Sequence, residues 1–283
     1  MRIGFIGAGN MAMALAGAIA SSEPAATFIA SDVSADQRER FREAVEEAMR
    51  QASGEELPQR ESGDPAGARC ITSEDNAQVA AEADLVFLAV KPQVLDKVYP
   101  DIVSTTGLVV SIAAGVRIAS IEAALARARV VRVMPNTPGL VGEMAAGYAG
   151  GSRATAEDTA LVGRLLSAAG TAVEVPEEQL DAVTGVAGSG PAFVARLIEA
   201  FTEAGVGHGL DRETAYELVL ATFRGTAQLL KQTGMSPQGL VDMVSSPNGT
   251  TVAGRAVLES SNIKTIIRET VDSTVSRAKE LGS

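Results

Sequence analysis

The sequence predicts an α/β domain with a doubly wound, mostly parallel sheet, followed by an all-α domain. Short β-branched runs alternate with segments of helical periodicity through residues 1–176, a pattern typical of a parallel sheet covered by helices. From Glu177 onward the strand signals stop and only helical periodicity continues. We therefore expect an α/β domain at 1–176 and a helical domain at 177–283.

The strand candidates are short and apolar. They are Arg2–Ile6, Thr27–Ala30, Leu85–Val90, Leu108–Ile112, Val130–Met134 and Ala172–Val175. Near-continuous apolar runs, of which 85–90 is the clearest, suit strands with helices on both faces. Residues 53–68 depart from this pattern because they are polar, rich in turn residues and longer than a usual connection. We expect a mobile surface loop there.

The helical domain carries apolar helix faces. Its predicted helices cover residues 177–208, 211–234, 236–245, 249–260 and 262–281. Several of their faces are rich in Ala, Leu, Val and Gly and hold few charges. A domain of ~100 residues with so much apolar helix surface is expected to pack against another copy of the chain. The prediction is a homodimer at least.

Composition excludes several classes of partner. The net charge of −11 argues against nucleic acid or an anionic membrane surface. With one cysteine and one histidine, neither an internal disulfide nor a Cys/His metal cluster can form, so no metal is expected. The uncharged stretch 107–116 is far shorter than the ~20 residues that span a bilayer. Because the first strand begins with no signal peptide before it, we expect a cytoplasmic protein.

The first predicted strand leads into a glycine-rich turn of the Rossmann type. Gly7-Ala8-Gly9-Asn10-Met11-Ala12 follows the strand and opens a predicted helix. Gly7 permits the tight turn, Gly9 lets a pyrophosphate approach the backbone, and the small Ala12 allows close packing of helix and strand. The free N–H groups and positive dipole of the helix start then favour phosphate. The motif predicts a dinucleotide site.

Asp32, at the end of the second predicted strand, bears on which dinucleotide binds. A carboxylate there accepts hydrogen bonds from the ribose hydroxyls of NAD and repels the 2′-phosphate of NADP. Arg38 and Arg40 would offset that repulsion if they turned inward, although such arginines more often form the solvated face of a helix. We expect NADH to be favoured, with NADPH left open.

Small residues and a lysine follow later strands, at the sheet edge where open α/β folds bind ligands. Ala89-Val90-Lys91-Pro92 ends one run and Ser111-Ile112-Ala113-Ala114-Gly115 ends the next. The small side chains leave room for a nicotinamide ring. Lys91 can reach a ribose or phosphate, but as a surface lysine at a helix start it would be equally ordinary.

In the helical domain, a turn-forming segment precedes a helix. Ser245-Ser246-Pro247-Asn248-Gly249-Thr250-Thr251 forces a turn, and the N–H groups of the first helical turn have no partner within the helix. The segment is either an ordinary N-cap or an anion cradle in which the hydroxyls of Ser246, Thr250 and Thr251 are extra donors. A second glycine-rich run, Gly185–Phe193, indicates close approach by a packed helix or a ligand.

Together, these segments resemble the pyrroline-5-carboxylate reductase family. The resemblance covers nearly the whole chain, in the family's order: Phe5–Ala12, Ala89–Gln93, Met134–Pro138, Asp181–Gly185, Gly188–Ala192 and Ser245–Thr251. The chain departs from the family pattern at Arg255, where an aliphatic residue is usual, and in the long segment 53–68.

The resemblance implies site residues, an assembly and a reaction. The cofactor contacts that it implies are Ile6, Gly7, Ala8, Gly9, Asn10, Met11, Asp32, Asn76, Ala89, Val90, Lys91, Pro92 and Ala114. The substrate contacts that it implies are Glu177, Thr250 and Thr251, with Ser246 beside them. It further implies a dimerisation domain with interleaved helices, assemblies up to decamers, and reduction of (S)-1-pyrroline-5-carboxylate to L-proline.

The residue inventory suits reduction of an imine by NADH or NADPH. A cyclic imine protonates near neutral pH and is then already electrophilic, so proximity and electrostatics can supply much of the acceleration. We assign the helix start at Gly249–Thr251 to the substrate carboxylate. We assign the hydroxyl of Thr251, as the catalytic group, to the ring nitrogen.

Two other functions compete with this one. A carbonyl reductase of the β-hydroxyacid dehydrogenase type has a similar layout, but it usually takes a proton from a lysine in the first long helix of its second domain. Residues 177–230 contain no lysine. A non-catalytic dinucleotide sensor would have no need of a carboxylate cradle and would show no turnover with any imine or carbonyl.

Overall fold

The chain folds into two compact units. The computed structural model describes residues 1–54 and 69–282, so most of the loop expected at 53–68 lies outside the described residues. One unit comprises Met1–Ser189 together with Thr274–Ser283, and the other comprises Gly190–Ser273. The first unit therefore continues beyond residue 176, where the sequence pattern changes from mixed to helical.

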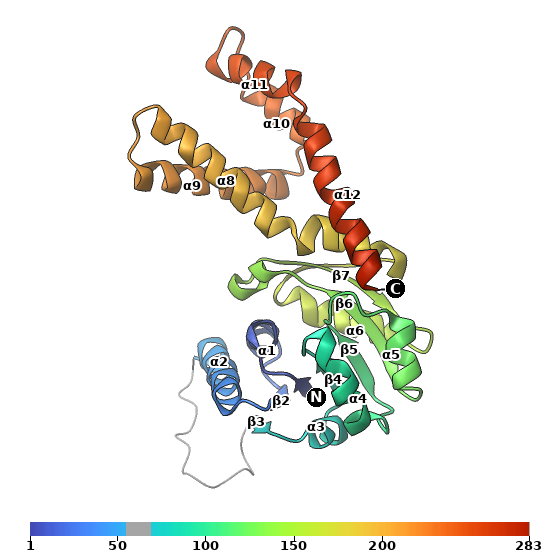
Figure 1. The fold of residues 1–283 in the computed structure, drawn as a ribbon. Helices are drawn as coiled ribbons and strands as arrows, with labels where there is room; N and C mark the ends of the chain where they lie inside the picture. The colour runs from blue at the N-terminus through green and yellow to red at the C-terminus, as the bar shows by residue number, and fades with distance from the viewer. Residues whose placement is uncertain (55–68, 283) are drawn as a thin grey trace. The chain divides into compact units, whose positions relative to one another are not determined.

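A single sheet forms the centre of the first unit (Figure 1). Its strands are β1 (Arg2–Ile6), β2 (Thr27–Ser31), β3 (Cys70–Ser73), β4 (Leu85–Leu88), β5 (Leu108–Ser111), β6 (Arg129–Met134), β7 (Met144–Gly150) and β8 (Gly170–Glu174). Their spatial order is β3-β2-β1-β4-β5-β6-β7-β8. The pairs are parallel except for β6 with β7, which is antiparallel. The predicted doubly wound, mostly parallel sheet is thus confirmed.

Helices cover both faces of this sheet, as Figure 1 shows. The helices of the two layers are α1 (Asn10–Ser22), α2 (Ala35–Ser53) and α6 (Ala156–Ser167) on one face, and α3 (Asn76–Glu82), α4 (Leu95–Ile102) and α5 (Ile118–Ala124) on the other. Shorter turns are η1 (Pro92–Val94), η2 (Thr137–Val141), η3 (Glu177–Gln179), α7 (Leu180–Val183) and the π-helical η4 (Thr184–Gly188). Alternate side chains of each buried strand enter the two layers, so Phe5 stacks on Phe87 with ring centroids 4.8 Å apart, while its neighbour Ile6 joins the opposite core.

The second unit consists of helices among the described residues. They are α8 (Gly190–Gly207), α9 (Arg212–Thr233), α10 (Pro237–Met243), α11 (Thr250–Ser260) and the beginning of α12 (Ile263–Leu281), whose end belongs to the first unit. Within the unit α8 packs against α9, where the rings of Phe201 and Phe223 meet edge to face at 5.7 Å. No helix among the described residues combines the length and the hydrophobicity that a membrane-spanning helix needs.

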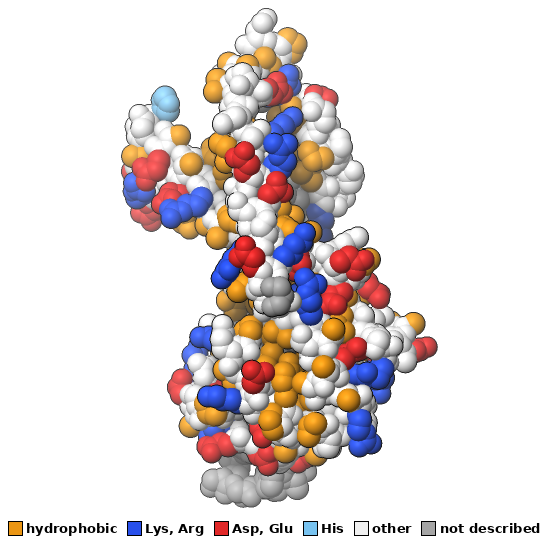
Figure 2. All heavy atoms as spheres, turned by 45° about the vertical axis from the view of Figure 1, so that its right-hand side comes forward, with side chains coloured by type: hydrophobic (Ala, Val, Ile, Leu, Met, Phe, Trp, Pro, Cys, Tyr) orange, Lys and Arg blue, Asp and Glu red, His pale blue; other side chains and the backbone are white. Residues whose placement is uncertain are grey.

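Large apolar side chains remain exposed on this helical unit. They include Phe201, Tyr216, Leu218, Val257, Leu258 and Ile266. Figure 2 shows hydrophobic side chains, in orange, at the surface of these helices. These exposed side chains agree with the apolar helix faces predicted from the sequence. An apolar face that is exposed in one copy of the chain is available to pack against another copy.

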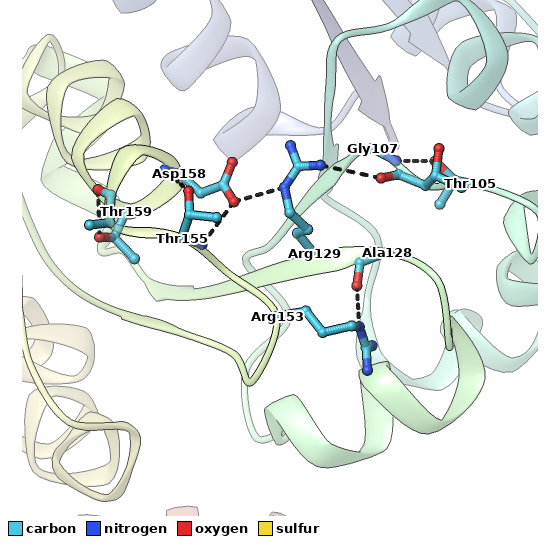
Figure 3. A network of polar contacts seen from close by, with 10 residues as sticks. Thr105, Gly107, Ala128, Arg129, Arg153, Thr155, Asp158 and Thr159 are labelled. Atoms are coloured by element: carbon cyan, nitrogen blue, oxygen red, sulfur yellow. Dashed lines mark hydrogen bonds and ion pairs between the residues drawn. The ribbon is translucent and has the colours of Figure 1, made fainter.

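A network of polar contacts ties the amino end of β6 to the beginning of α6 (Figure 3). Arg129 donates from Nε to Oδ2 of Asp158 over 2.8 Å, and the same oxygen accepts the backbone N–H of Thr155 over 3.0 Å. Asp158 and Thr155 form a capping box at the start of α6. Burial raises the pKa of the Asp158 carboxyl, but the hydrogen bonds from Arg129 and Thr155 outweigh burial and hold that pKa below its ordinary value.

Asp158→Asn is expected to lower the free energy of unfolding by about 2 kcal/mol at neutral pH, because it removes a charge-assisted hydrogen bond and weakens a helix cap. Since the folded-state pKa of Asp158 is depressed, this stabilisation is present above the ordinary value of 3.8 and is lost as the pH falls through the folded-state pKa. Urea denaturation of both proteins across this pH range measures the difference. Glu43→Gln, which removes a charge from an exposed position in α2, serves as the control. A difference between wild type and Asp158→Asn that stays constant into strong acid would contradict the assignment.

Candidate functional site

The glycine-rich turn lies at the carboxyl end of β1, between the ends of its two neighbouring strands. Gly7 has φ +96°, and its N–H donates to the carbonyl of Ser31 at the end of β2 over 2.8 Å. A Cβ at this position would lie 2.7 Å from the carbonyl oxygen of Ala89, just beyond β4. Both the left-handed backbone and the close approach of Ala89 therefore require glycine here.

At Gly9, no contact within the described chain requires glycine, in contrast to Gly7. Gly9 is the N-cap of α1, with φ −74°, a value that any residue adopts, and no heavy atom of the described chain lies within 4 Å of a Cβ built there. Neither backbone conformation nor internal packing demands glycine at this position. The helix it caps has no side-chain cap bond and no acidic residue in its first turn. This helix start fits a phosphate group that approaches the backbone closely.

The carboxylate of Asp32 joins the end of β2 to the glycine-rich turn. Its Oδ2 accepts the N–H of Ala8 over 2.9 Å, and its Oδ1 accepts the N–H of Ser34 over 2.9 Å. Each carboxylate oxygen can accept a further hydrogen bond, so Asp32 stays able to bind ribose hydroxyls. Arg38 turns inward rather than into solvent, because its NH1 donates to the backbone carbonyl of Asp32 over 2.6 Å. Arg40 is exposed.

The other cofactor candidates lie at the ends of the neighbouring strands. Asn76, the first residue of α3, accepts the Ser31 hydroxyl over 2.7 Å and donates to Asp101 over 2.8 Å. Ala89 and Val90 are half-buried after β4, whereas Lys91 is exposed as the N-cap of η1. Ala114 is exposed after β5. The structure thus brings Ala8 into contact with Asp32 and Gly7 close to Ala89, and the remaining candidates lie along the same edge of the sheet.

Glu177 takes part in a group of charged side chains within the first unit. Its Oε1 accepts the N–H of Ile118 over 2.7 Å and NH1 of Arg132 over 3.0 Å. Arg132 is only 3% exposed, and its NH2 lies 4.0 Å from Asp181, which Arg117 also approaches to 3.7 Å. A cavity of about 650 Å³ lies beside Glu177, lined by residues within 149–160 and 174–177, and it includes none of the glycine-rich turn.

Arg132 was not among the predicted site residues, although the sequence contained a signal for it. Arg132 lies in the middle of β6 with apolar residues on either side, and a cation buried there must be paired. The identity of its partners was not predictable, because Glu177 lies far along the chain from Arg132.

The substrate candidates of the second unit lie at the start of α11. Gly249 is the N-cap of this helix and has no side-chain cap bond, so neither Thr250 nor Thr251 is the cap residue. Asn248 has φ +59°, the left-handed conformation that turns the chain into the helix. Thr250 and Thr251 are exposed in the first turn. The turn therefore presents N–H groups and two hydroxyls at one helix start, as an anion cradle requires.

The departure at Arg255 has a local explanation. Arg255 forms an ion pair with Glu259 on the same helix at 3.1 Å, and its NH1 lies 3.4 Å from the hydroxyl of Ser245. Ser245 in turn donates to the carbonyl of Val241 over 2.6 Å. The arginine thus links α11 to the segment that follows α10.

Models of known protein families match both the N-terminal and the C-terminal part of the chain. Residues 177–281 match the family model described as pyrroline-5-carboxylate reductase dimerisation, and residues 2–115 match the model described as NADP oxidoreductase, coenzyme F420-dependent. A pyrroline-5-carboxylate reductase of Pseudomonas aeruginosa is 39% identical over 99% of this chain and 96% of its own. One of Methanosarcina acetivorans is 46% identical over 74% of this chain and 79% of its own.

Solved structures of pyrroline carboxylate reductases are similar to this chain over nearly its whole length. A pyrroline-5-carboxylate reductase from Coxiella burnetii superposes with a TM-score of 0.86 at 33% identity, covering 99% of this chain and 98% of that one. A pyrroline carboxylate reductase of Plasmodium falciparum with NADP bound superposes with a TM-score of 0.78 at 28% identity, covering 100% of this chain and 98% of that one.

Proposed function

This chain belongs to the pyrroline-5-carboxylate reductase family, and we propose which of its residues bind the cofactor and the substrate of this reductase. The chain is an NAD(P)-dependent oxidoreductase that reduces pyrroline-5-carboxylate to proline. A bound reduced nicotinamide dinucleotide supplies the hydride. The observation that carries the proposal is the open, uncapped start of α1 at Gly9, where nothing inside the described chain explains a glycine.

The proposed cofactor site follows the carboxyl edge of the sheet. The first turn of α1, from Gly9 to Met11, binds the pyrophosphate through backbone N–H groups. Asp32 accepts hydrogen bonds from the adenosine ribose hydroxyls while it holds the N–H of Ala8. Residues 89–92 and Ala114, at the ends of β4 and β5, line the nicotinamide half.

The proposed substrate site uses the start of α11. The first-turn N–H groups after Gly249 bind the substrate carboxylate, and the hydroxyls of Ser246 and Thr250 supplement them. The hydroxyl of Thr251 accepts a hydrogen bond from the protonated ring nitrogen. As a separate proposal for the first unit, Glu177 is a substrate contact through Oε2, because its Oε1 already accepts hydrogen bonds from Arg132 and from the N–H of Ile118.

The helical unit makes the chain a homo-oligomer. We propose a homodimer at least, with a decamer as the larger assembly that the family implies. The exposed apolar side chains of α8, α9 and α11 support this proposal. We also propose a cytoplasmic location, where reduced dinucleotide is available for biosynthesis.

We propose that NADH is used at least as well as NADPH, because the Asp32 carboxylate repels a 2′-phosphate. Asp32→Ser is then expected to raise the ratio of kcat/KM with NADPH to that with NADH by about tenfold or more, equivalent to roughly 1.4 kcal/mol of removed repulsion. Asp36→Ser, which removes the same charge from an exposed position in α2, is the control. A wild-type enzyme with a hundredfold preference for NADPH would contradict this proposal.

A further inference from the structure

At the end of β2, the guanidinium of Arg38 lies between the backbone carbonyl of Asp32 and the carboxylate of Glu74. Arg38 donates from NH1 to the backbone carbonyl of Asp32 over 2.6 Å and from NH2 to Oε1 of Glu74 over 2.7 Å. The Arg38 side chain is 16% exposed, whereas that of Glu74 is 75% exposed. Glu74 stands in the loop between β3 and α3. The ion pair therefore links α2 to the loop that follows β3.

This position matters for the proposed cofactor site, on which the inference rests. In Rossmann folds the group at the end of the second strand meets the adenosine ribose, and a nearby arginine accommodates a 2′-phosphate. Here the nearby arginine is Arg38, held within hydrogen-bond distance of the Asp32 backbone. The NH2 group of Arg38 already donates to the carboxylate of Glu74. A 2′-phosphate would have to compete with Glu74 for the same guanidinium.

We propose that Glu74 is a positioning residue for cofactor selectivity, which keeps Arg38 paired and so weakens binding of any ligand that carries a 2′-phosphate on its ribose. Asp32 repels that phosphate directly, whereas Glu74 acts through the arginine. A ligand with a free 2′-hydroxyl makes no demand on Arg38 and is therefore insensitive to the pair. The two carboxylates select between the cofactors by different routes.

The test compares two nucleotides that differ only in the 2′-phosphate, adenosine 2′,5′-bisphosphate and adenosine 5′-monophosphate. Their dissociation constants are measured by calorimetry on the full-length protein. Glu74→Gln keeps the shape of the side chain and frees Arg38. It is expected to tighten binding of the bisphosphate by about three- to fivefold, the upper part of the range for a partly exposed ion pair, and to change binding of the monophosphate by less than about twofold.

Two further variants assign the effect to Arg38. Arg38→Gln is expected to weaken bisphosphate binding, and Glu74→Gln on that background is expected to add nothing. Glu82→Gln also removes a carboxylate from an ion pair, with Arg2 at the start of β1, and controls for the change in net charge. It is expected to change neither dissociation constant.

Three results would overturn the inference. They are equal changes for the two nucleotides in Glu74→Gln, the same gain in Glu82→Gln, or a gain that persists without the Arg38 guanidinium. Failure of the proposed function would look different, because wild-type protein would then show no turnover of pyrroline-5-carboxylate with NADH. The nucleotide titrations do not depend on turnover.

Discussion

Gly9→Val is expected to raise the dissociation constant for NADH by at least about 100-fold, because the new side chain fills the space in which the pyrophosphate meets the start of α1. Loss of two charge-assisted hydrogen bonds at about 1.5–3 kcal/mol each is enough for this effect. The fold should persist, since a Cβ at this position meets no atom of the described chain and φ is −74°. A calorimetric titration with NADH measures the loss.

The control for this variant is Gly9→Ala. Alanine and valine are both poor N-cap residues, so each is expected to lower the free energy of unfolding by no more than about 1 kcal/mol. Alanine adds one methyl group and should weaken NADH binding much less than valine. Unchanged affinity in Gly9→Val, or equal loss in both variants, would show that the pyrophosphate does not bind at this helix start.

Thr251→Val is expected to lower kcat/KM for pyrroline-5-carboxylate by about 10- to 150-fold, with little change in the dissociation constant for NADH. Valine keeps the branched shape but removes the hydrogen bond to the ring nitrogen, whose positive charge is lost as hydride arrives. A bond to such a group contributes about 1.5–3 kcal/mol. Steady-state kinetics with each substrate varied in turn separates the two effects.

Thermal unfolding distinguishes this catalytic role from a structural one. Since Gly249, not Thr251, is the N-cap of α11, loss of the Thr251 hydroxyl should leave stability almost unchanged. Thr222→Val removes a hydroxyl that donates to the Leu218 carbonyl within α9 and controls for the general effect of this substitution. If stability falls while kcat/KM stays within about threefold, the assignment of Thr251 to the ring nitrogen is wrong.

The elements with strong local patterns were predictable. The apolar runs that became β1, β4, β5 and β6 were identified to within a residue or two, and the predicted helices at 211–234, 236–245, 249–260 and 262–281 correspond to α9 through α12. The predicted helix at 177–208 is divided in the structure, because its first part forms η3, α7 and η4 and α8 begins at Gly190. The strands that escaped prediction lack such patterns. β3 (Cys70–Ser73) is short and ends in Thr and Ser, and β7 (Met144–Gly150) consists mostly of Ala and Gly. Both are strands because neighbouring strands pair with them, which local propensity does not report.

Within the candidate site too, features set by a local sequence pattern were predictable and features set by distant residues were not. The turn at Gly7 and the open helix start at Gly9 follow from a motif whose spacing determines the local backbone. The direction of Arg38 was left open in the sequence because it depends on Glu74, which β3 brings near. Likewise the partner of Arg132 is Glu177, from a distant part of the chain. Charged pairs between residues far apart in the sequence are decided by tertiary structure rather than by local pattern.

The most direct test of the central claim is a steady-state assay of the purified full-length protein with pyrroline-5-carboxylate and each reduced cofactor in turn. Oxidation of the cofactor and formation of proline are measured in the same reaction. We predict equimolar amounts of oxidised cofactor and proline, with NADH at least as effective as NADPH. Binding of the reduced cofactor without formation of proline would contradict the account and would indicate a dinucleotide sensor.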